Sequence, residues 1–280
     1  MNQPLPQIIK AVPIELDPNS RTQDAYHQIV EACLIHATAN VPLINLHVAD
    51  GVHQCRVALR RLRSAIALFS KQLDKTSRKQ VIHELRSLGK MLSPARDWDV
   101  FLTETIPSLP PTNGIHDLLS EAERNRSSAY AAIRRDAWDS LRDKIARIKV
   151  RGHDLDEPIS DTAPDLLGRQ ARKVKRCVQH LNTPVQRHAL RKALKKLRYS
   201  VEFVGSLYEA KEAKRYLDHC KDAQELLGKM NDTATTVGLL SLITTTASHD
   251  LIAWAKDQNE KSAEQVPEIV RQLRAAKRFW

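Results

Sequence analysis

The sequence predicts an all-α protein built from two similar helical units. Only 8 of its 280 residues are glycine and 5% are aromatic, whereas the abundant Leu, Ala, Arg, Lys and Glu favour helix through intrinsic propensity. No run of alternating apolar and polar residues is long enough to indicate a β-strand. Two stretches, 53–69 and 188–204, repeat one pattern of basic and apolar residues at an offset of 135 (188 − 53). A match this dense indicates an internal duplication.

The first unit is expected to cover residues 19–150, after an irregular leader at 1–18 that contains four prolines. Its helices are predicted at about 20–40, 51–73, 77–92 and within 114–150. Residues typical of N-terminal caps precede the first three helices: Asn19 or Ser20, Asp50 and Thr76. Ser93 and Pro94 have the pattern of a cap followed by a proline in the first turn. Three prolines then interrupt the helical pattern: Pro107, Pro110 and Pro111.

The second unit is expected at 161–280, after a polar linker at 151–160 (RGHDLDEPIS). Thr183 and Pro184 open a long basic helix that is predicted to end near residue 209. Further helices are predicted at about 162–181, 211–228, 231–246, 249–258 and 263–277. The repeat extends beyond the basic helices, because LGKM occurs at 88–91 and 227–230 and Asp97 corresponds to Asp232 at the offset of 135.

Two predicted helices carry a stripe of cations opposite an apolar face. The first stripe consists of His53, Arg56, Arg60 and Arg63, with Arg61 beside it. The second stripe consists of His188, Arg191, Lys195 and Arg198, with Lys192, Lys196 and Tyr199 beside it. Neither 53–73 nor 188–201 contains an acidic residue, although like charges one turn apart repel each other. A solvated surface is one explanation, and a bound anion that compensates the repulsion is the other.

A third stripe makes the second unit richer in charge than the first. It lies on the predicted helix 162–181 and consists of Arg169, Arg172, Lys173, Arg176 and His180. The corresponding helix near the N-terminus lacks these basic residues. We therefore expect any anion site to be asymmetric between the two units.

The net charge of +11 indicates an anionic partner. Arginine binds phosphate oxygens in bidentate fashion and lysine acts as a point charge. Because the stripes include only one aromatic residue, Tyr199, a polymer of bare phosphates fits them better than nucleic acid, whose bases usually stack on aromatic rings. Nucleic acid held by its backbone phosphates stays open as an alternative. A phosphohydrolase is a second alternative, although the chain has no glycine-rich phosphate loop.

Other sequence features indicate a soluble cytoplasmic protein without a cofactor. The four cysteines show no C-x-x-C spacing, which is typical of reduced, buried thiols. We see neither a secretion signal nor an apolar run long enough to span a bilayer. No histidine or cysteine cluster has the ligand spacing of a metal site. Arginine and lysine normally stay charged between pH 6 and 8, so we expect the affinity for an anion to change little in that range, apart from histidine protonation.

Four segments carry motifs of a known family: VHQCRVALRRLRSA (52–65), LGKMLSPARDWDV (88–100), LRKALKKLRYSVEF (190–203) and LLGKMND (226–232). Through these motifs the chain resembles the CHAD domain (conserved histidine α-helical domain) family over about residues 20–280. The resemblance implies two pseudo-symmetric helical bundles around a central basic cavity. It also implies a non-catalytic protein that binds inorganic polyphosphate, in some members on polyphosphate granules.

By this resemblance the residues of the two central stripes would line the cavity, with Asp97 and Asp232 supporting the arginines. Leu34, Thr38 and Val41 depart from the pattern, because they occupy positions in the first helix where basic residues would be expected. The departure again predicts an asymmetric site.

Overall fold

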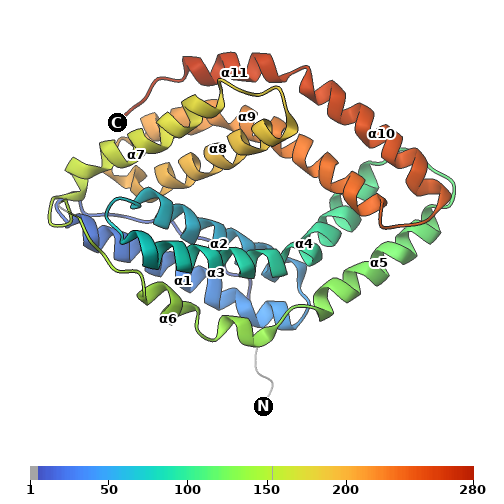
Figure 1. Ribbon diagram of the computed structural model, residues 1–280, viewed down its shortest axis with the longest axis horizontal. Helices are drawn as coiled ribbons and strands as arrows, with labels where there is room; N and C mark the ends of the chain where they lie inside the picture. The colour runs from blue at the N-terminus through green and yellow to red at the C-terminus, as the bar shows by residue number, and fades with distance from the viewer. Residues whose placement is uncertain (1–5, 153) are drawn as a thin grey trace.

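The computed structural model describes residues 6–152 and 154–280, and helices form all of its regular elements within that part. The first half contains α1 (Thr22–Asn45), α2 (Ala49–Leu68), α3 (Lys75–Met91), α4 (Ser93–Val100), α5 (Ile115–Ala131) and α6 (Leu141–Ala146). The second half contains α7 (Ile159–Cys177), α8 (Pro184–Val204), α9 (Ala210–Leu240), α10 (Thr246–Ala263) and α11 (Val266–Ala275). In Figure 1, α1, α2, α3 and α6 form the lower layer, and α7, α8, α9 and α11 form the upper layer. The prediction of an all-α fold is confirmed.

Several predicted helix boundaries are correct and others are wrong. Thr183 caps α8, as the sequence suggested, and the structure adds a reciprocal capping box between Thr183 and Gln186. The cap of α3 is Asp74, whose carboxylate accepts a hydrogen bond from the Ser77 N–H at 2.9 Å, and not Thr76. The predicted break at 228–231 is absent, since α9 continues through Gly228 with one buried face on both sides of it.

When the bounds of α1, α2 and α5 are shifted by the offset of 135, they overlap those of α7, α8 and α10. α3 and α4 follow each other end to end and correspond together to the single helix α9. LGKM repeats at an offset of 139 (227 − 88), whereas Asp97 and Asp232 repeat at 135 (232 − 97), so the first half has four additional residues between them. Four residues are close to one helical turn, which keeps the later residues near the same helix face.

The apolar core joins the halves instead of separating them. One core cluster combines residues of α1, α2 and α3 with residues of α7, α8 and α9. A second cluster combines Trp98, Phe101 and Leu118 of the first half with Leu240 and Leu251 of the second. Each of the two clusters therefore draws on residues of both halves.

Close packing positions α2, the helix of the first basic stripe. A Cβ atom on Gly51 would lie 2.3 Å from the Leu43 Cβ atom of α1, so only glycine permits this approach. Residues 6–18 of the leader contain no helix, and they pack against the core through Ile14 and Leu16, which are buried, whereas residues 1–5 of the expected leader lie outside the described residues. The expected linker is bonded to the first half: Arg151 N–H donates to the Gln72 carbonyl at 2.7 Å, and Thr22 N–H donates to the Glu157 carbonyl at 2.9 Å.

Further expectations can be compared with the described residues. All four cysteines are free; Cys33, Cys55 and Cys220 are buried, and Cys177 is partly exposed. Within 6–152 and 154–280, every helix is too short or too polar to cross a lipid bilayer.

Candidate anion-binding site

The cations of α2 are positioned by the apolar residues on its opposite face. Cys55, Leu59 and Leu62 are completely buried in the core. The other face presents the first stripe, His53, Arg56, Arg60 and Arg63, whose side chains are all partly exposed. This arrangement follows from the helical period that the sequence displays.

α8 is oriented in the same way by Leu190, Leu194 and Leu197, which are buried. Arg191, Lys195 and Arg198 of its stripe are partly buried, whereas His188, Lys192 and Lys196 are exposed.

The stripes of α2 and α8 approach each other closely enough for their charges to interact. Burial lowers the pKa of Arg191, Asp232 opposes this effect, and repulsion from Arg60 of the other half lowers the pKa further. Burial also lowers the pKa of Arg56; the attraction of Asp97 opposes this effect, and repulsion from Arg60, Arg96 and Arg191 lowers the pKa further. The structure therefore brings cations of the two halves into one cluster.

Lys195 is the most perturbed cation of this cluster. Burial lowers its pKa to about 7, and the positive charges of Arg60 and Arg191 contribute to the shift. Asp232 opposes the shift, and Arg198 adds a smaller repulsion. A lysine in this environment is only partly charged at neutral pH, because both desolvation and like charges disfavour the ammonium form.

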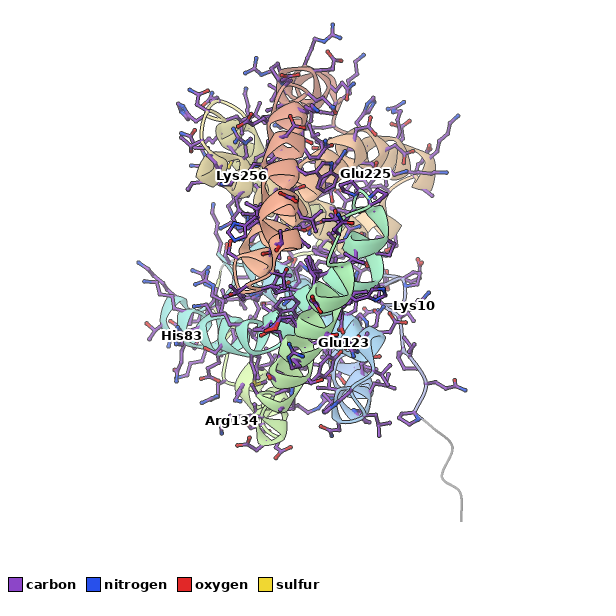
Figure 2. All side chains as sticks on the ribbon, turned by 90° about the vertical axis from the view of Figure 1, so that its right-hand side faces the viewer. Lys10, His83, Glu123, Arg134, Glu225 and Lys256 are labelled. Atoms are coloured by element: carbon purple, nitrogen blue, oxygen red, sulfur yellow. The ribbon has the colours of Figure 1, made fainter. Side chains whose placement is uncertain are left out.

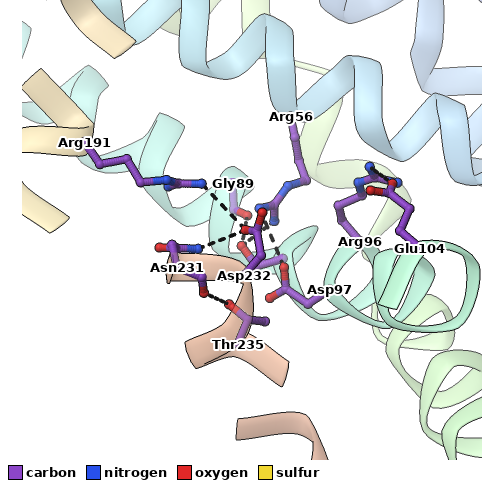
Figure 3. A network of polar contacts seen from close by, with 10 residues as sticks. Arg56, Gly89, Arg96, Asp97, Glu104, Arg191, Asn231, Asp232 and Thr235 are labelled. Atoms are coloured by element: carbon purple, nitrogen blue, oxygen red, sulfur yellow. Dashed lines mark hydrogen bonds and ion pairs between the residues drawn. The ribbon is translucent and has the colours of Figure 1, made fainter. Parts of the chain in front are cut away.

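Asp97 and Asp232 each lie beside one arginine of the cluster (Figure 3). An Arg56 Nη atom is 3.9 Å from Asp97 Oδ1, and an Arg191 Nη atom is likewise 3.9 Å from Asp232 Oδ1. At this distance each carboxylate forms an ion pair with its arginine but no hydrogen bond. Both pairs obey the offset of 135 (191 − 56 and 232 − 97), so equivalent contacts occur in the two halves.

The two carboxylates also influence each other. The pKa of Asp97 is raised by burial, and the nearby charge of Asp232 raises it further against the attraction of Arg56. Figure 3 shows both side chains converging on the same place from α4 and α9. The Arg56 guanidinium is held from a second direction, because it donates to Ser93 Oγ at 2.5 Å. The carboxylates thus keep both arginines close to the junction of the halves.

Asp99 has a different role from its neighbour Asp97. It is buried, and its carboxylate accepts hydrogen bonds from Arg126 Nε and from the Tyr130 hydroxyl, both at 2.7 Å. These contacts fasten α4 to α5, so Asp99 has a structural role.

Two residues that the sequence assigned to the phosphate site lie elsewhere. Arg61 has a side chain that is only 7% exposed, and its Nη1 atom donates to Glu202 Oε2 at 2.9 Å. Its guanidinium also lies 5.0 Å from the centre of the Phe203 ring. Tyr199 is buried, with the Arg198 guanidinium 4.8 Å from its ring centre. Their assignment to the ligand surface is corrected, because both belong to the contact between α2 and α8.

The α7 stripe is divided between packing and exposure. Arg169 Nη2 donates to the Leu68 carbonyl at 3.3 Å, where its charge is favourable at the C-terminal end of α2. Lys173 Nζ donates to Gln170 Oε1 at 3.3 Å. Arg172, Arg176 and His180 are exposed. Only part of this stripe therefore lies next to the central cations.

Sequence reasoning missed three cations that the fold adds to the cluster, Arg78 and Arg86 of α3 and Arg96 of α4. Burial and then Arg60 contribute most to the lowered pKa of Arg63, and Arg86 lowers this pKa further. Burial and other cations likewise contribute most to the lowered pKa of Lys173, and Arg78 adds to the effect. Arg96 contributes to the lowered pKa of His53, after burial. The glycine of LGKM could have indicated that α3 lies close to the first stripe, because Arg63 Nη1 lies 3.7 Å from the position of a Cβ atom on Gly89.

The two stripe histidines, His53 and His188, lie next to cations of the cluster. Burial lowers the pKa of His53, and the charges of Arg96 and Arg60 lower it further. Burial followed by the charges of Lys192 and Arg191 lowers the pKa of His188. Both imidazoles are therefore biased toward the neutral form, which can donate one N–H to a phosphate oxygen.

Known proteins resemble this chain in sequence and in fold. An uncharacterized protein of Mycobacterium tuberculosis strain CDC 1551 / Oshkosh is 25% identical over 260 residues, and a second one from strain H37Rv matches equally. The alignments cover 82% of this chain and 49% of each relative, so the chain spans about half the length of the curated relatives it matches.

Two solved structures share the fold. The crystal structure of the CHAD domain from the plant Ricinus communis has a TM-score of 0.81 and 24% identity, over 97% of this chain and 98% of that one. PptA from Streptomyces chartreusis has a TM-score of 0.68 and 13% identity, over 91% of this chain and 99% of its own. The sequence model of the CHAD domain matches residues 28–241. Because this match covers most of the chain, the protein belongs to the CHAD domain family.

Proposed function

We propose that this protein binds inorganic polyphosphate without catalysis, through the cations of α2 and α8. The observation that carries the proposal is the convergence of Arg60, Arg191 and Lys195, which belong to different halves and repel one another. Desolvation and repulsion cost free energy in the empty protein. A multivalent anion would offset that cost at several positions simultaneously.

Family membership supports the same ligand, because CHAD domains are associated with polyphosphate-related proteins. The central basic cavity that the family resemblance implies stays a prediction. Each charge-assisted contact with a phosphate oxygen contributes about 1.5–3 kcal/mol, and linked phosphates add avidity. Association with polyphosphate granules would be a consequence of such binding.

A polymer of bare phosphates fits the cluster better than nucleic acid. Tyr199, the aromatic residue of the stripes, is buried beneath Arg198 and offers no free face for a base. The neighbouring polar groups are guanidinium and ammonium groups, which recognise phosphate oxygens. Nucleic acid held by its backbone is therefore the secondary candidate, and the experiment below distinguishes the two.

Calorimetric titration with long-chain polyphosphate tests the proposal. If seven cations of the cluster contact phosphates (Arg56, Arg60, Arg63, Arg191, Lys192, Lys195 and Lys196), log K should fall with log salt with a slope of about −5. Long-chain polyphosphate should also displace labelled RNA at a lower phosphate concentration than RNA displaces polyphosphate. Failure to bind polyphosphate, or preferential binding of RNA, would contradict the proposal. Release of phosphate on addition of magnesium or manganese would instead indicate a phosphohydrolase.

A pair of charge-reversal variants provides the matched control. Arg60→Glu with Lys195→Glu should weaken polyphosphate binding by more than about tenfold, since two charge-assisted contacts are lost. Lys211→Glu with Lys214→Glu changes the formal net charge equally, on exposed residues of a separate groove along α9. Equal losses in the two double variants would show that net charge, and not the cluster, governs binding.

A further inference from the structure

One carboxylate breaks the symmetry between the two sides of the α2–α8 contact. At the offset of 135, Arg63 corresponds to Arg198 and Arg61 corresponds to Lys196. Arg61 and Arg198 lie on one side of the contact, and Arg63 and Lys196 on the other. Glu202 pairs with both cations of the first side: its Oε2 atom is 2.9 Å from Arg61 Nη1 and its Oε1 atom is 3.5 Å from Arg198 Nε. A single side chain thus neutralises two cations there.

The other side has no equivalent carboxylate. The residue that corresponds to Glu202 (202 − 135 = 67) is Ala67. Within residues 6–152 and 154–280, neither Arg63 nor Lys196 has an acidic oxygen within 4.0 Å. Burial lowers the pKa of Arg63 to about 10, and repulsion from Arg60, Arg86 and Arg56 adds to this effect. The two cations without a carboxylate therefore remain available to an external anion.

The cations without a carboxylate continue outward between α3 and α7. Arg63 Nη1 lies over Gly89 of α3, and Arg86 is located one turn earlier on that helix. On α7, Arg169 reaches the end of α2, and Lys173 follows one turn later. Burial lowers the pKa of Lys173, and Lys196 contributes the largest repulsion. We call this row the open side; its residues are Arg63, Arg78, Arg86, Lys173 and Lys196.

The corresponding positions on the opposite side lack this charge. At the offset of 139, Arg78 and Arg86 correspond to Leu217 and Glu225 of α9. At the offset of 135, three α7 cations correspond to residues of α1: Arg169 to Leu34, Lys173 to Thr38 and Arg176 to Val41. Figure 2 shows α3, marked by His83, and α9, marked by Glu225, on opposite sides of the molecule. We call the α1–α9 side the closed side.

We infer that a bound polyphosphate leaves the α2–α8 cluster along the open side only, and that Glu202 keeps the closed side unavailable. The inference rests on the proposed function and specifies the ligand further, as a chain long enough to occupy the central cluster and the open side together. From His53 to Arg63, α2 alone rises about 15 Å. A short anion cannot contact both regions, so affinity should increase with chain length until the open side is filled.

Ala67→Glu tests the inference by copying the closed side onto the open side. The new carboxylate would follow Arg63 by one turn, as Glu202 follows Arg198. Affinity for long-chain polyphosphate should fall about tenfold, because Arg63 and Lys196 lose their phosphate contacts. The salt slope should become shallower by about 0.7–1.4, which corresponds to one or two contacts. Affinity for tripolyphosphate should fall much less, because a short anion can bind at Arg60, Arg191 and Lys195 without contacting Arg63 and Lys196.

Two matched controls separate charge from size and from side. Ala67→Gln has nearly the same size as the test substitution and no charge, so it should bind long chains like the wild type. Thr38→Glu adds one carboxylate at an exposed position of the closed side, and it should also leave binding unchanged. Arg86→Ala removes an exposed cation of the open side without disturbing the core, and it should weaken only the binding of long chains.

The outcomes distinguish this inference from the proposed function. If the wild type fails to bind long-chain polyphosphate, the proposed function itself is wrong. If the wild type binds, but Ala67→Glu and Thr38→Glu reduce affinity equally, the ligand uses both sides and the one-sided path is refuted. The same conclusion follows if Arg86→Ala binds long chains like the wild type, or if Ala67→Glu weakens tripolyphosphate as much as the polymer.

Discussion

Polyphosphate binding should take up a proton at Lys195. In the free protein the pKa of Lys195 is lowered to about 7 by burial and then by repulsion from Arg60 and Arg191. Phosphates next to the ammonium favour its charged form and return its pKa toward the ordinary value of 10.5. The free state therefore holds fewer protons than the bound state between these two values, and affinity must fall as pH rises through this window.

The size of the effect follows from the two pKa values. With a pKa of about 7 in the free state and 10.5 in the bound state, binding takes up about half a proton at pH 7 and about one proton at pH 9. Affinity should consequently decrease about tenfold from pH 6 to pH 8, and about 100-fold from pH 6 to pH 9. The lowered pKa of Lys195 therefore predicts a larger change in affinity between pH 6 and 8 than ordinary lysine pKa values do.

Calorimetry in two buffers of different ionisation enthalpy measures the proton uptake directly. Lys195→Arg is the matched control, because it keeps the positive charge but does not titrate in this range. The variant should bind with a much weaker pH dependence above pH 7. Any remaining increase below pH 7 should come from His53 and His188, whose pKa values are lowered in the free protein. Equal proton uptake by the wild type and the variant at pH 8 would refute the assignment to Lys195.

Three further predictions concern stability and the counter-ions of the cluster. In the wild type, the buried ammonium of Lys195 costs up to about 5 kcal/mol while it is protonated, so the free energy of unfolding should rise between pH 7 and 10 as the proton is lost. Lys195→Met should remove this rise and should increase the unfolding temperature of the free protein at pH 6. An unchanged pH profile of unfolding would contradict this prediction. Asp97→Asn with Asp232→Asn should strengthen polyphosphate binding about fivefold, because the two carboxylates 3.9 Å from Arg56 and Arg191 would no longer compete with phosphate for these arginines. Weaker binding in calorimetry would show that the carboxylates mainly position the arginines. Gly51→Ala should destabilise the fold by about 3 kcal/mol in urea unfolding, because the new Cβ atom would collide with Leu43. Gly228→Ala should instead stabilise the fold by about 0.5–1 kcal/mol, because its Cβ atom would meet no atom within 4 Å. Equal effects of the two substitutions would contradict the packing argument.

Helical periodicity is local information, and it determined much of what the sequence predicted. The positions of His53, Arg56 and Arg60 opposite Cys55, Leu59 and Leu62 follow from the turn of one helix, so they required no tertiary contact. The capping box at Thr183 is likewise formed within four residues. Helix boundaries that depend on packing were harder to predict from the sequence. The uninterrupted α9 is an example, because its buried face outweighs the weak helix propensity of Gly228.

The tertiary structure alone decided which cations face one another and which are neutralised. Arg61 and Lys196 occupy equivalent positions in the repeat, yet Glu202 binds Arg61 within the α2–α8 contact and leaves Lys196 exposed. Arg78 and Arg86 belong to a helix without an obvious stripe, and they join the cluster only because α3 packs beside α2. The sequence predicted a difference between the two halves, whereas the structure divides the cations by side. Burial and electrostatic coupling depend on residues far apart in the chain, and for this reason the pKa of Lys195 and the one-sided distribution of charge were outside the reach of sequence periodicity.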